Sequence, residues 1–450
     1  MLVNGLENIE RIYFIGIGGI SMNALAKFFA EQGYCVSGSD VCESELTREL
    51  SFYGVKVFIG SNPQRKELLQ ADCVVYTDAI RENDGELVHA KSLGKRVIAR
   101  AELLEIVSQN FKRVVSVAGS HGKTTCTSMC AHILKSCKVP FTSHIGGMDL
   151  ELGNFYSVGR EYLVTEACEY KKNLLKIPSD VAVLLNIDKD HMECYDGEDD
   201  LVDTFFQYGK KARTALACAD NALCKRFTDF STFAIRDVFA DYRAVQIRAY
   251  NEQYAFTILE YGRKVGRVKL NCVGYCNIYN ALAAFGAMRS LGFNEAEIVN
   301  GLESFSGVKR RFEKIGACMG ANFVCDYAHH PREIASTFMT AQKICRGNLY
   351  VVFQPHTYSR TKFLMDDFVQ TLCGVSNLII YKTYSAREQY DKSGSAQTLA
   401  NNVGNCSYAD NENDLRCLLS ENINAGDMVL FLGAGDIYSI AKNLVKEIAL

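Results

Sequence analysis

The sequence predicts an α/β protein of three domains: an N-terminal Rossmann-like parallel sheet, a central α/β domain with a phosphate-binding loop and an antiparallel extension, and a C-terminal Rossmann-like domain. Three observations predict this fold. Short apolar runs alternate with helical patterns along most of the chain. Glycine-rich turns follow two of these runs, near residues 16–21 and 119–122. The chain of 450 residues also exceeds the size of about 250–300 residues at which one hydrophobic core stops growing.

Composition narrows the class of protein. Hydrophobic residues make up 48% and charged residues 22% of the chain, which is typical of a globular enzyme. The formal charge of −3 leaves no basic excess to neutralise phosphate arrays, so neither a nucleic acid nor a membrane surface is an expected partner. No run approaches the roughly 18 apolar residues that a membrane span requires.

The 18 cysteines are scattered from Cys35 to Cys417 and form no Cys-x-x-Cys pair. The closest spacings, Cys126 with Cys130 and Cys272 with Cys276, fit neither a zinc ribbon nor a redox motif. The first residues lack the charged and apolar regions of a signal peptide. We therefore expect a cytoplasmic protein in which most cysteines are buried, reduced thiols.

The first domain begins with a near match to the dinucleotide-binding fingerprint. A buried strand at Arg11–Ile17 enters the turn at residues 16–21, and a second strand at Cys35–Ser39 ends at Asp40. Ser21 occupies the third glycine position, so the match is partial. Two interpretations stay open: a turn that only packs, or a helix N-terminus that holds a diphosphate other than NAD. Further strands of this parallel layer are predicted at Lys56–Ile59, Cys73–Tyr76 and Arg96–Ala99.

The central domain begins with a loop typical of phosphate binding. An apolar strand, Val114–Ala118, enters Gly-x-x-Gly-Lys-Thr-Thr at residues 119–125, and a helix is predicted from Thr124 to Cys137. The strict phosphate-loop motif, Gly-x4-Gly-Lys-Ser/Thr, has a glycine at the position that Val117 occupies here. Glycines let the backbone approach phosphates, Lys123 supplies positive charge, and a hydroxyl can ligate Mg²⁺. The alternative is an ordinary glycine-rich turn with an exposed lysine.

Two later strands of this domain end in polar residues. Tyr162–Glu166 ends at Glu166, and Val181–Leu185 leads into residues 186–191, which end at His191. Carboxyl ends of parallel strands share one edge of a sheet, so we expect this carboxylate and imidazole to lie beside the loop, where they suit a divalent cation. The alternatives are a solvated strand-end carboxylate and a capping or core histidine.

Residues 214–270 change to short strands with polar turns, among them Ala244–Ala249 and Tyr254–Glu260, which predicts an antiparallel extension. A long helix follows, with Asn277 as its expected cap. Asn280 lies inside that helix, where asparagine is a poor helix former, and a hydrogen bond to a base would explain its presence.

The stretch Ser306–Phe312 indicates a linker, and beyond it apolar runs again alternate with helical patterns. Strands are predicted at Phe323–Asp326, Leu349–Phe353, Leu378–Tyr381 and Val429–Leu432. Polar clusters follow three of them and predict a site at one sheet edge. These clusters are Asp326–Pro331, Gln354–Arg360 and Gly433–Asp436. Zinc is not expected at His329, His330 and His356, because no cysteine or acid completes a tetrahedral set at a usual spacing.

Taken together and in order, these motifs resemble the Mur ligase family over nearly the whole chain. The motifs that carry the resemblance are Gly16–Met22, Gly119–Thr125, Glu166–Glu169, Asn186 with Asp190–Met192, Asn277–Ala281, Arg310–Phe312, Asp326–Pro331 and Gln354–His356. The resemblance implies a UDP-sugar-binding domain at residues 1–106, a central P-loop ATPase domain at 107–307 and a closing domain for amino acid and nucleotide at 308–450.

The resemblance also implies a reaction. ATP, with Mg²⁺, would phosphorylate the lactyl carboxylate of UDP-N-acetylmuramate, and the amine of L-alanine would attack the acyl phosphate, as a step of peptidoglycan precursor synthesis. The protein would be a monomer or weak homodimer. Three alternatives remain: a related ligase that adds a preformed peptide to the same sugar nucleotide, an NAD(P)-dependent oxidoreductase built on the first fingerprint, and a non-catalytic nucleotide switch.

Roles follow for the residues that match the family's motifs. The resemblance implies catalytic roles for Lys123, Glu166, His191 and Arg311, and metal binding by Thr124, Glu166 and His191. It implies nucleotide binding by Gly119, His121, Gly122, Lys123, Thr124, Thr125, Asn280, Arg311 and Asp326. It implies substrate binding by Gly18, Gly19, Ser21, Asp40, Tyr327, His329 and Arg360.

The chain departs from the family's pattern at three places. Cys276 replaces a histidine often found before the first asparagine of the Asn-x-x-Asn motif, and Thr357 stands where some alanine-adding members carry arginine, which leaves Arg360 as the better candidate. Residues 192–207 contain no lysine that could be carbamylated as in sister ligases, consistent with the alanine-adding branch.

Overall fold

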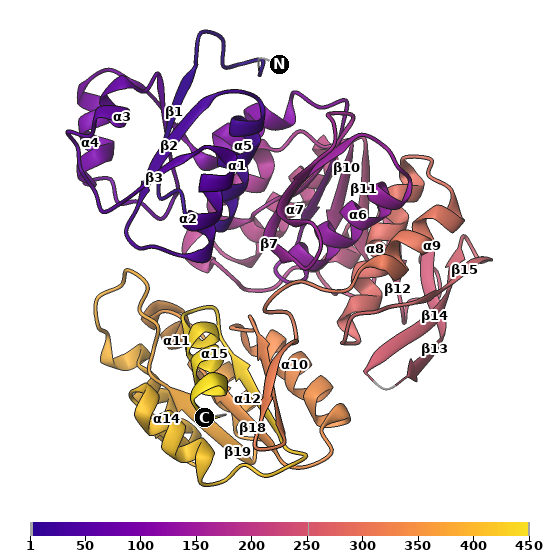
Figure 1. The fold of residues 1–450 in the computed structure, drawn as a ribbon. Helices are drawn as coiled ribbons and strands as arrows, with labels where there is room; N and C mark the ends of the chain where they lie inside the picture. The colour runs from indigo at the N-terminus through magenta and orange to yellow at the C-terminus, as the bar shows by residue number, and fades with distance from the viewer. Residues whose placement is uncertain (1–2, 251, 449–450) are drawn as a thin grey trace. The chain divides into compact units, whose positions relative to one another are not determined.

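The computed structural model describes residues 3–250 and 252–448, which form three sheets in two compact units (Figure 1). The first unit takes up most of the chain as far as Ser306 and holds two of the sheets. The second unit takes up the chain from Gly307 and holds the third. The predicted three-domain α/β fold is confirmed. The domain boundaries at 106 and 307 stay predictions.

The first sheet is parallel, in the order β3-β2-β1-β4-β5, as the sequence predicts. Its strands are β1 (Arg11–Ile15), β2 (Cys35–Asp40), β3 (Lys56–Ile59), β4 (Cys73–Tyr76) and β5 (Arg96–Ala99). The helices α3 (Lys66–Gln70) and α4 (Gly85–Ser92) lie on one face, and α1 (Ile20–Glu31) and α5 (Arg100–Ser108) lie on the other (Figure 1). The strand order reverses between β1 and β4, so the turn after β1 lies where open α/β sheets bind ligands.

The second sheet has ten strands in the order β15-β14-β13-β12-β11-β10-β6-β9-β7-β8. The strands are β6 (Arg113–Ala118), β7 (Phe141–Asp149), β8 (Gly153–Ser157), β9 (Tyr162–Glu166), β10 (Val181–Leu184), β11 (Thr214–Cys218), β12 (Ser231–Ala234), β13 (Tyr242–Tyr250), β14 (Gln253–Glu260) and β15 (Arg263–Lys269). The main helices are α6 (Lys123–Ser136), α7 (Glu198–Lys211), α8 (Cys276–Ser290) and α9 (Glu295–Ser304). Because β6 lies between β9 and β10, the ends of these three strands meet at one edge.

Two expectations for this sheet need correction. The antiparallel extension does not begin near residue 214, because β11, β12 and β13 pair in parallel and the β14–β15 hairpin is antiparallel. The strands β7 and β8, which pair antiparallel with each other, were not predicted. Their segments are rich in glycine and polar residues, so they lack the apolar run that indicated the other strands.

One hydrophobic core runs through both sheets of the first unit. It includes Phe28 of α1 and Phe155 of β8, whose ring centroids lie 6.4 Å apart. Lys27, only 1% exposed, donates to Asn154 at 2.8 Å and pairs with Glu49 at 2.9 Å. Burial lowers the pKa of Lys27, with Glu49 opposing that effect. The first domain is therefore joined to the second by shared apolar packing and by a buried polar network.

The second unit is a six-stranded sheet in the order β16-β17-β21-β18-β19-β20, in which β16 pairs antiparallel and the others in parallel. The strands are β16 (Glu313–Cys318), β17 (Ala321–Asp326), β18 (Leu349–Phe353), β19 (Asn377–Tyr381), β20 (Ser407–Ala409) and β21 (Met428–Leu432). The helices are α10 (Pro331–Ile344), α11 (Tyr358–Phe363), α12 (Met365–Leu372), α13 (Ala396–Val403), α14 (Glu412–Ser420) and α15 (Ile437–Ile448). The short strands β16 and β20 were not predicted.

All 18 cysteines are free thiols, and eight of them are buried. The expectation that most would be buried was therefore wrong, although the absence of disulfides among them was expected. Within residues 3–250 and 252–448, no helix combines the length and the apolar character that crossing a bilayer demands.

Candidate active site

The phosphate loop connects β6 to α6 and depends on two glycines with positive φ. Gly119 has φ +141° and Gly122, which caps α6, has φ +86°. A side chain at Gly122 would also place its Cβ 2.6 Å from Oδ1 of Asn280. Glycine is thus required for both the backbone conformation and the close approach of α8. The free N–H groups at the start of α6 can then face an anion.

The segment after β10 braces this loop. The backbone N–H of His121 donates to Oδ1 of Asn186 at 2.8 Å, and Nδ2 of Asn186 donates to the His121 carbonyl at 3.0 Å. The imidazole of His121 lies 2.9 Å from a carboxylate oxygen of Asp188, whose N–H donates to the Ser120 hydroxyl. These hydrogen bonds fix the loop to the segment that follows β10. The conformation of the loop therefore depends on residues almost 70 positions away in the sequence.

Lys123, the predicted phosphate-binding lysine, is largely buried at the start of α6. Its ammonium donates to the Gly119 carbonyl at 2.5 Å and to Oε1 of Glu169 at 2.9 Å. Burial lowers the pKa of Lys123, but the carboxylate of Glu169 outweighs that effect, so the pKa lies above its ordinary value. Lys123 is therefore a permanent cation at the mouth of the loop.

A cluster suited to a cation lies beside this lysine. Ligand atoms of Glu169, Asp190 and His191 all lie within 4.8 Å of one another. In the described part of the chain, the buried Oε2 of Glu169 has no hydrogen-bond partner. An unsatisfied buried carboxylate oxygen is costly unless a cation compensates it. The two carboxylates and the imidazole thus fit a divalent metal ion.

This cluster differs from the predicted pair of Glu166 and His191. The carboxylate of Glu166 accepts a hydrogen bond from the Gly146 N–H at 2.6 Å, and Glu166 is not a member of the group around His191. Glu169 and Asp190 lie within two of the sequence motifs, but no role was predicted for them. Their signal was their position just after strand ends, in two segments that flank β6 in the sheet. Metal binding by Glu166 stays a prediction.

The backbone around the cluster is strained. Lys171 and Lys172 have φ +51° and +56°, and His191 has φ +55°. Residues other than glycine rarely adopt this region, at a cost of about 1–2 kcal/mol each. Lys171 pairs with Asp78 at 3.3 Å and Lys172 with Asp200 at 2.7 Å. These ion pairs secure the turn that presents Glu169.

Asn280 lies on α8 directly over the loop, with Nδ2 donating to Oδ1 of Asn277 at 2.9 Å. Its side chain oxygen approaches Gly122, so the structure brings this predicted nucleotide-binding residue to the phosphate loop. Thr124 and Thr125 are buried in the first turn of α6. Asn277 was expected to cap α8 but is its second residue.

A second group of predicted residues meets at the start of α1. The N–H of Gly18 donates to Oδ2 of Asp40 at 2.8 Å, and Asp40 also accepts from the Val41 N–H. Both carboxylate oxygens thus hold the turn in place. Ser21 lies one residue into α1, where Nε2 of His144 approaches its hydroxyl at 2.8 Å and Arg100 donates to it at 3.2 Å. His144 and Arg100 were not predicted.

His144 is buried on β7 and is only 6% exposed. Burial, reinforced by the guanidinium of Arg100, lowers the pKa of His144 to about 4. The imidazole of the folded protein is therefore neutral at physiological pH, whereas in the unfolded chain it would titrate near pH 6.5.

This shift predicts a pH dependence of stability. Between about pH 6.5 and pH 4 the unfolded chain binds a proton at His144 that the folded protein does not, so the free energy of unfolding falls as the pH falls. We expect the stability of wild type relative to His144→Gln to drop by about 3 kcal/mol between pH 7 and pH 4, because the folded protein takes up this proton only near pH 4. Urea unfolding of both proteins across this range measures it, and a constant difference would contradict it.

In the second unit, three predicted substrate-binding residues belong to one chain of contacts, which runs from Tyr327 through His329 and His356 to Arg360. The ring of His329 lies 6.0 Å from His356 and 5.3 Å from Tyr327, and Arg360 donates to Nδ1 of His356 at 3.2 Å. The guanidinium of Arg311 lies 5.2 Å from the ring of Tyr327. The structure therefore brings Tyr327, His329, Arg360 and Arg311 to the carboxyl edge of this sheet.

Asp326 ends β17 at the same edge. It accepts hydrogen bonds from the N–H groups of Phe312 and Ala328, at 2.7 and 2.8 Å. Burial raises the pKa of Asp326, and Arg311 opposes that effect. Its role as a ribose-binding acid stays a prediction.

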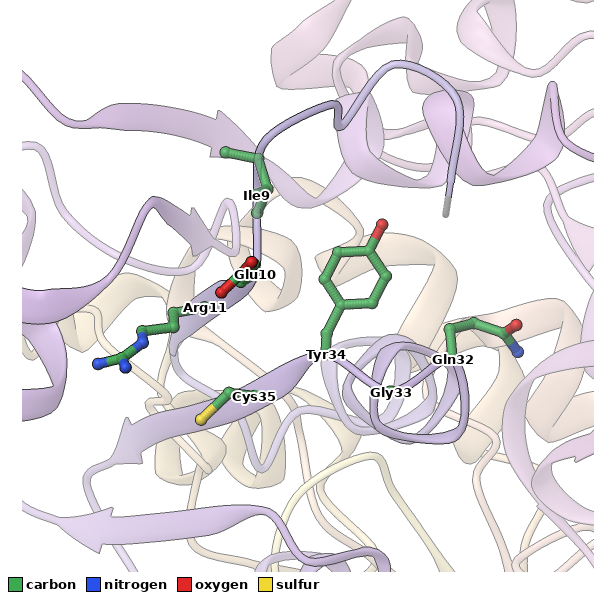
Figure 2. Close-up of a pocket in the computed structure, with 7 residues that line it drawn as sticks. All are labelled: Ile9, Glu10, Arg11, Gln32, Gly33, Tyr34 and Cys35. Atoms are coloured by element: carbon green, nitrogen blue, oxygen red, sulfur yellow. The ribbon is translucent and has the colours of Figure 1, made fainter. Parts of the chain in front are cut away.

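A pocket lined by Ile9, Arg11, Gln32, Tyr34 and neighbouring residues lies elsewhere (Figure 2). It lies at the amino ends of β1 and β2, whereas the turn that carries Gly18 follows the carboxyl end of β1. Ligands of open α/β sheets bind outside the carboxyl ends of the strands, so this pocket is not a candidate for the active site.

A braced glycine-rich loop, a buried lysine and a cluster suited to a cation at one sheet edge are the features of a nucleotide-dependent enzyme of the phosphate-loop class. Comparison with protein families narrows this class. Residues 11–112 match the model described as Mur ligase family, catalytic domain, residues 117–288 match the Mur ligase middle domain, and residues 310–435 match the Mur ligase, glutamate ligase domain. The chain belongs to the Mur ligase family and is an ATP-dependent ligase.

Curated relatives match nearly the whole chain. A UDP-N-acetylmuramate--L-alanine ligase of Caldicellulosiruptor bescii is 35% identical over 98% of this chain and 99% of its own length. A ligase of the same name from Clostridium novyi is 37% identical over 98% of both chains.

Solved structures show the same likeness. The UDP-N-acetylmuramate-alanine ligase of Thermotoga maritima superposes with a TM-score of 0.84 at 25% identity, covering 97% of this chain and 98% of that one. A murein peptide ligase of Psychrobacter arcticus shares the fold, with a TM-score of 0.76 at 22% identity over 98% of this chain and 99% of that one.

Proposed function

We propose that the chain joins L-alanine to the lactyl carboxylate of UDP-N-acetylmuramate, with ATP and Mg²⁺, as a cytoplasmic step of peptidoglycan precursor synthesis. The observation that carries this proposal is 35–37% identity, over 98% of the chain, to ligases that bear that name. The motifs of all three domains lie in matching order, so the likeness includes the regions proposed to bind the sugar nucleotide and the amino acid.

The proposed chemistry explains the need for ATP. A carboxylate and an amine do not condense spontaneously in water, so the carboxylate oxygen first attacks the γ-phosphorus of ATP and ADP leaves. The amine of L-alanine then attacks the acyl phosphate, a tetrahedral intermediate forms, the amine loses a proton, and inorganic phosphate leaves as the amide forms. Both steps bring anions together, so positive charge fixed in the site lowers both barriers.

The residues of the first unit supply that charge and position. The N–H groups at the start of α6 and the ammonium of Lys123 would hold the phosphates of ATP. Glu169, Asp190 and His191 would hold a cation, with Thr124 as a further ligand, and a bound Mg²⁺ would shield the repulsion between phosphate and carboxylate. The turn with Gly18, Gly19 and Ser21, which Asp40 braces, would hold the diphosphate of the sugar nucleotide.

The second unit would contribute its own carboxyl-edge residues. We propose that Asp326 binds the ribose of ATP, that Arg311 contacts its phosphates, and that His329, Tyr327 and Arg360 recognise L-alanine. The neighbouring His356 keeps Arg360 oriented by accepting its hydrogen bond.

An assay of phosphate release tests the proposal. With UDP-N-acetylmuramate and ATP present, we expect L-alanine to give the fastest release, and glycine and L-serine to be slower, because one methyl group is worth only about 1–3 kcal/mol of discrimination. Release that depends on a preformed peptide instead of L-alanine would favour the alternative ligase. Release without any acceptor would favour the nucleotide switch, and protection against heat by NADH would favour the oxidoreductase.

A further inference from the structure

Arg100 lies beside the turn that is proposed to hold the diphosphate. It is the first residue of α5, and its guanidinium donates to the hydroxyl of Ser21 at 3.2 Å. A guanidinium carries five N–H donors and no acceptor. The direction of this hydrogen bond is therefore the same for either tautomer of His144, whose ring approaches the same hydroxyl.

The positive charge of Arg100 has no counterpart on the protein. In the described part of the chain, no carboxylate forms an ion pair with it, and the bond to Ser21 is the one hydrogen bond of its guanidinium. The nearby Lys123, by contrast, pairs with Glu169. Arg100 is partly exposed, and the buried side-chain nitrogens that lack a partner among the described residues all belong to other side chains. The unused N–H groups of Arg100 are therefore open to solvent, where an anion can reach them.

The turn itself supplies no positively charged side chain. Residues 16–21 are Gly-Ile-Gly-Gly-Ile-Ser, and Asp40 adds a carboxylate that accepts from the Gly18 N–H at 2.8 Å. A diphosphate would bring further negative charge to the same place. The start of a helix such as α1 offers only about half an elementary charge. A full positive charge beside the turn would therefore strengthen binding, and Arg100 is in direct contact with the turn.

The surroundings of Arg100 extend to the phosphate loop. Burial and the carboxylate of Glu169 raise the pKa of the Cys168 thiol to about 11. The positive charges of Lys123 and Arg100 both oppose that rise, so both cations act on the same thiol. Helix α5 also packs against the short 3₁₀ helix Tyr170–Lys176, which begins directly after Glu169. A sugar nucleotide that extends from the diphosphate turn toward the phosphate loop would therefore pass Arg100.

We propose that Arg100 is a substrate-binding residue whose guanidinium, held by the Ser21 hydroxyl, binds the diphosphate of the sugar nucleotide. This inference rests on the proposed function for the identity of the substrate, and it adds the cation that the predicted residues of the turn do not include. Arginine suits this role because its planar fork donates two parallel hydrogen bonds to phosphate oxygens. The lactyl carboxylate is the other anionic group of this substrate, and the experiment separates the two.

Calorimetry of the full-length chain tests the inference with UDP, which has the diphosphate but no carboxylate. Arg100→Gln is expected to weaken UDP binding about 10- to 100-fold, because charged hydrogen bonds to the diphosphate are lost. KM for UDP-N-acetylmuramate should rise to a similar extent, and KM for ATP should stay within twofold. Arg100→Lys keeps the charge but not the fork, so it should bind UDP about three- to tenfold more weakly than wild type. Unchanged UDP binding in Arg100→Gln, with a raised KM for UDP-N-acetylmuramate, would overturn the inference and assign Arg100 to the carboxylate.

Salt dependence separates a binding role from a structural one. Binding of UDP to wild type should weaken as the NaCl concentration rises, because salt screens the attraction between opposite charges. This dependence should be smaller in Arg100→Gln and retained in Arg100→Lys. A weaker affinity with the salt dependence of wild type in Arg100→Gln would mean that Arg100 only shapes the turn, and would overturn the inference. Should Arg100→Gln fail to fold, Arg100→Lys decides, since UDP affinity equal to that of wild type would contradict a bidentate contact.

Arg96→Gln is the matched control. Arg96 is exposed at the amino end of β5, whereas Arg100 follows the carboxyl end of the same strand. The substitution removes the same charge at the opposite edge of the sheet, so UDP binding should match that of wild type. The proposed function can fail independently. Wild type that binds UDP, and loses most of this binding in Arg100→Gln, supports the inference even if L-alanine proves not to be the acceptor.

Discussion

Replacement of Lys123 by alanine is expected to lower kcat of the ligase by about 100- to 1000-fold, comparable to the loss of one preorganised donor to a transition state. The ammonium lies at the start of α6, is fixed by Gly119 and Glu169, and has a raised pKa, so it is charged at every working pH. Removing it leaves the developing charge on the transferred phosphoryl group uncompensated. Steady-state phosphate release with saturating substrates measures the effect.

Lys135 provides the matched control for this variant. It lies on the same helix but pairs with Glu151 at the surface. Lys135→Ala should change kcat by less than twofold, since exposed ion pairs contribute little. If Lys123→Ala retained kcat within threefold of wild type, the assignment of Lys123 to the phosphates would be refuted.

Glu169→Gln is expected to weaken Mg²⁺ binding by about 10- to 100-fold, which is the second large effect. At low Mg²⁺ concentration the rate of phosphate release should fall to a similar extent. The carboxylate partners Lys123 through one oxygen and offers its unsatisfied oxygen to the cation cluster through the other. An amide keeps the shape of the side chain and removes its charge. The rate should be measured as a function of Mg²⁺ concentration, and high Mg²⁺ should restore part of it.

Glu198→Gln is the comparison for this variant, because Glu198 forms a surface ion pair with Lys189 at 3.3 Å. It should show the Mg²⁺ dependence of wild type. An unchanged Mg²⁺ dependence in Glu169→Gln would remove Glu169 from the proposed cation site. If only Glu166→Gln changed the Mg²⁺ dependence, Glu166 would be the metal ligand, as the sequence predicts.

Much of the architecture was predictable because its strands are buried on both faces. Runs such as Val114–Ala118 and Leu349–Phe353 are continuously apolar, as parallel strands between layers of helices must be. The turn between β6 and α6 was also predictable, because an apolar strand leads into Gly-x-x-Gly-Lys-Thr-Thr and a helical pattern follows it. Strands such as β7 escaped prediction because half of their residues are polar and contact other polar groups, as His144 does.

The candidate site was predictable only where residues are neighbours in the sequence or end a strand. Glu169 and Asp190 meet because β9 and β10 flank β6, which is a property of strand order and not of either segment. Likewise, His144 and Arg100 converge on Ser21 from 123 and 79 residues away. No local pattern encodes such distances, and only the packing of two sheets around one core creates them.

The continuous interior shared by the first two sheets has a consequence for engineering. If the chain were cut near residue 112, where one family match ends, each fragment would expose the part of the shared core that it carries, with Phe28 in one and Phe155 in the other. The ammonium of Lys27 would also lose its hydrogen bond to the amide of Asn154. Exchange of sugar-nucleotide-binding domains between ligases should therefore succeed only when α1 and β8 are taken from the same parent protein.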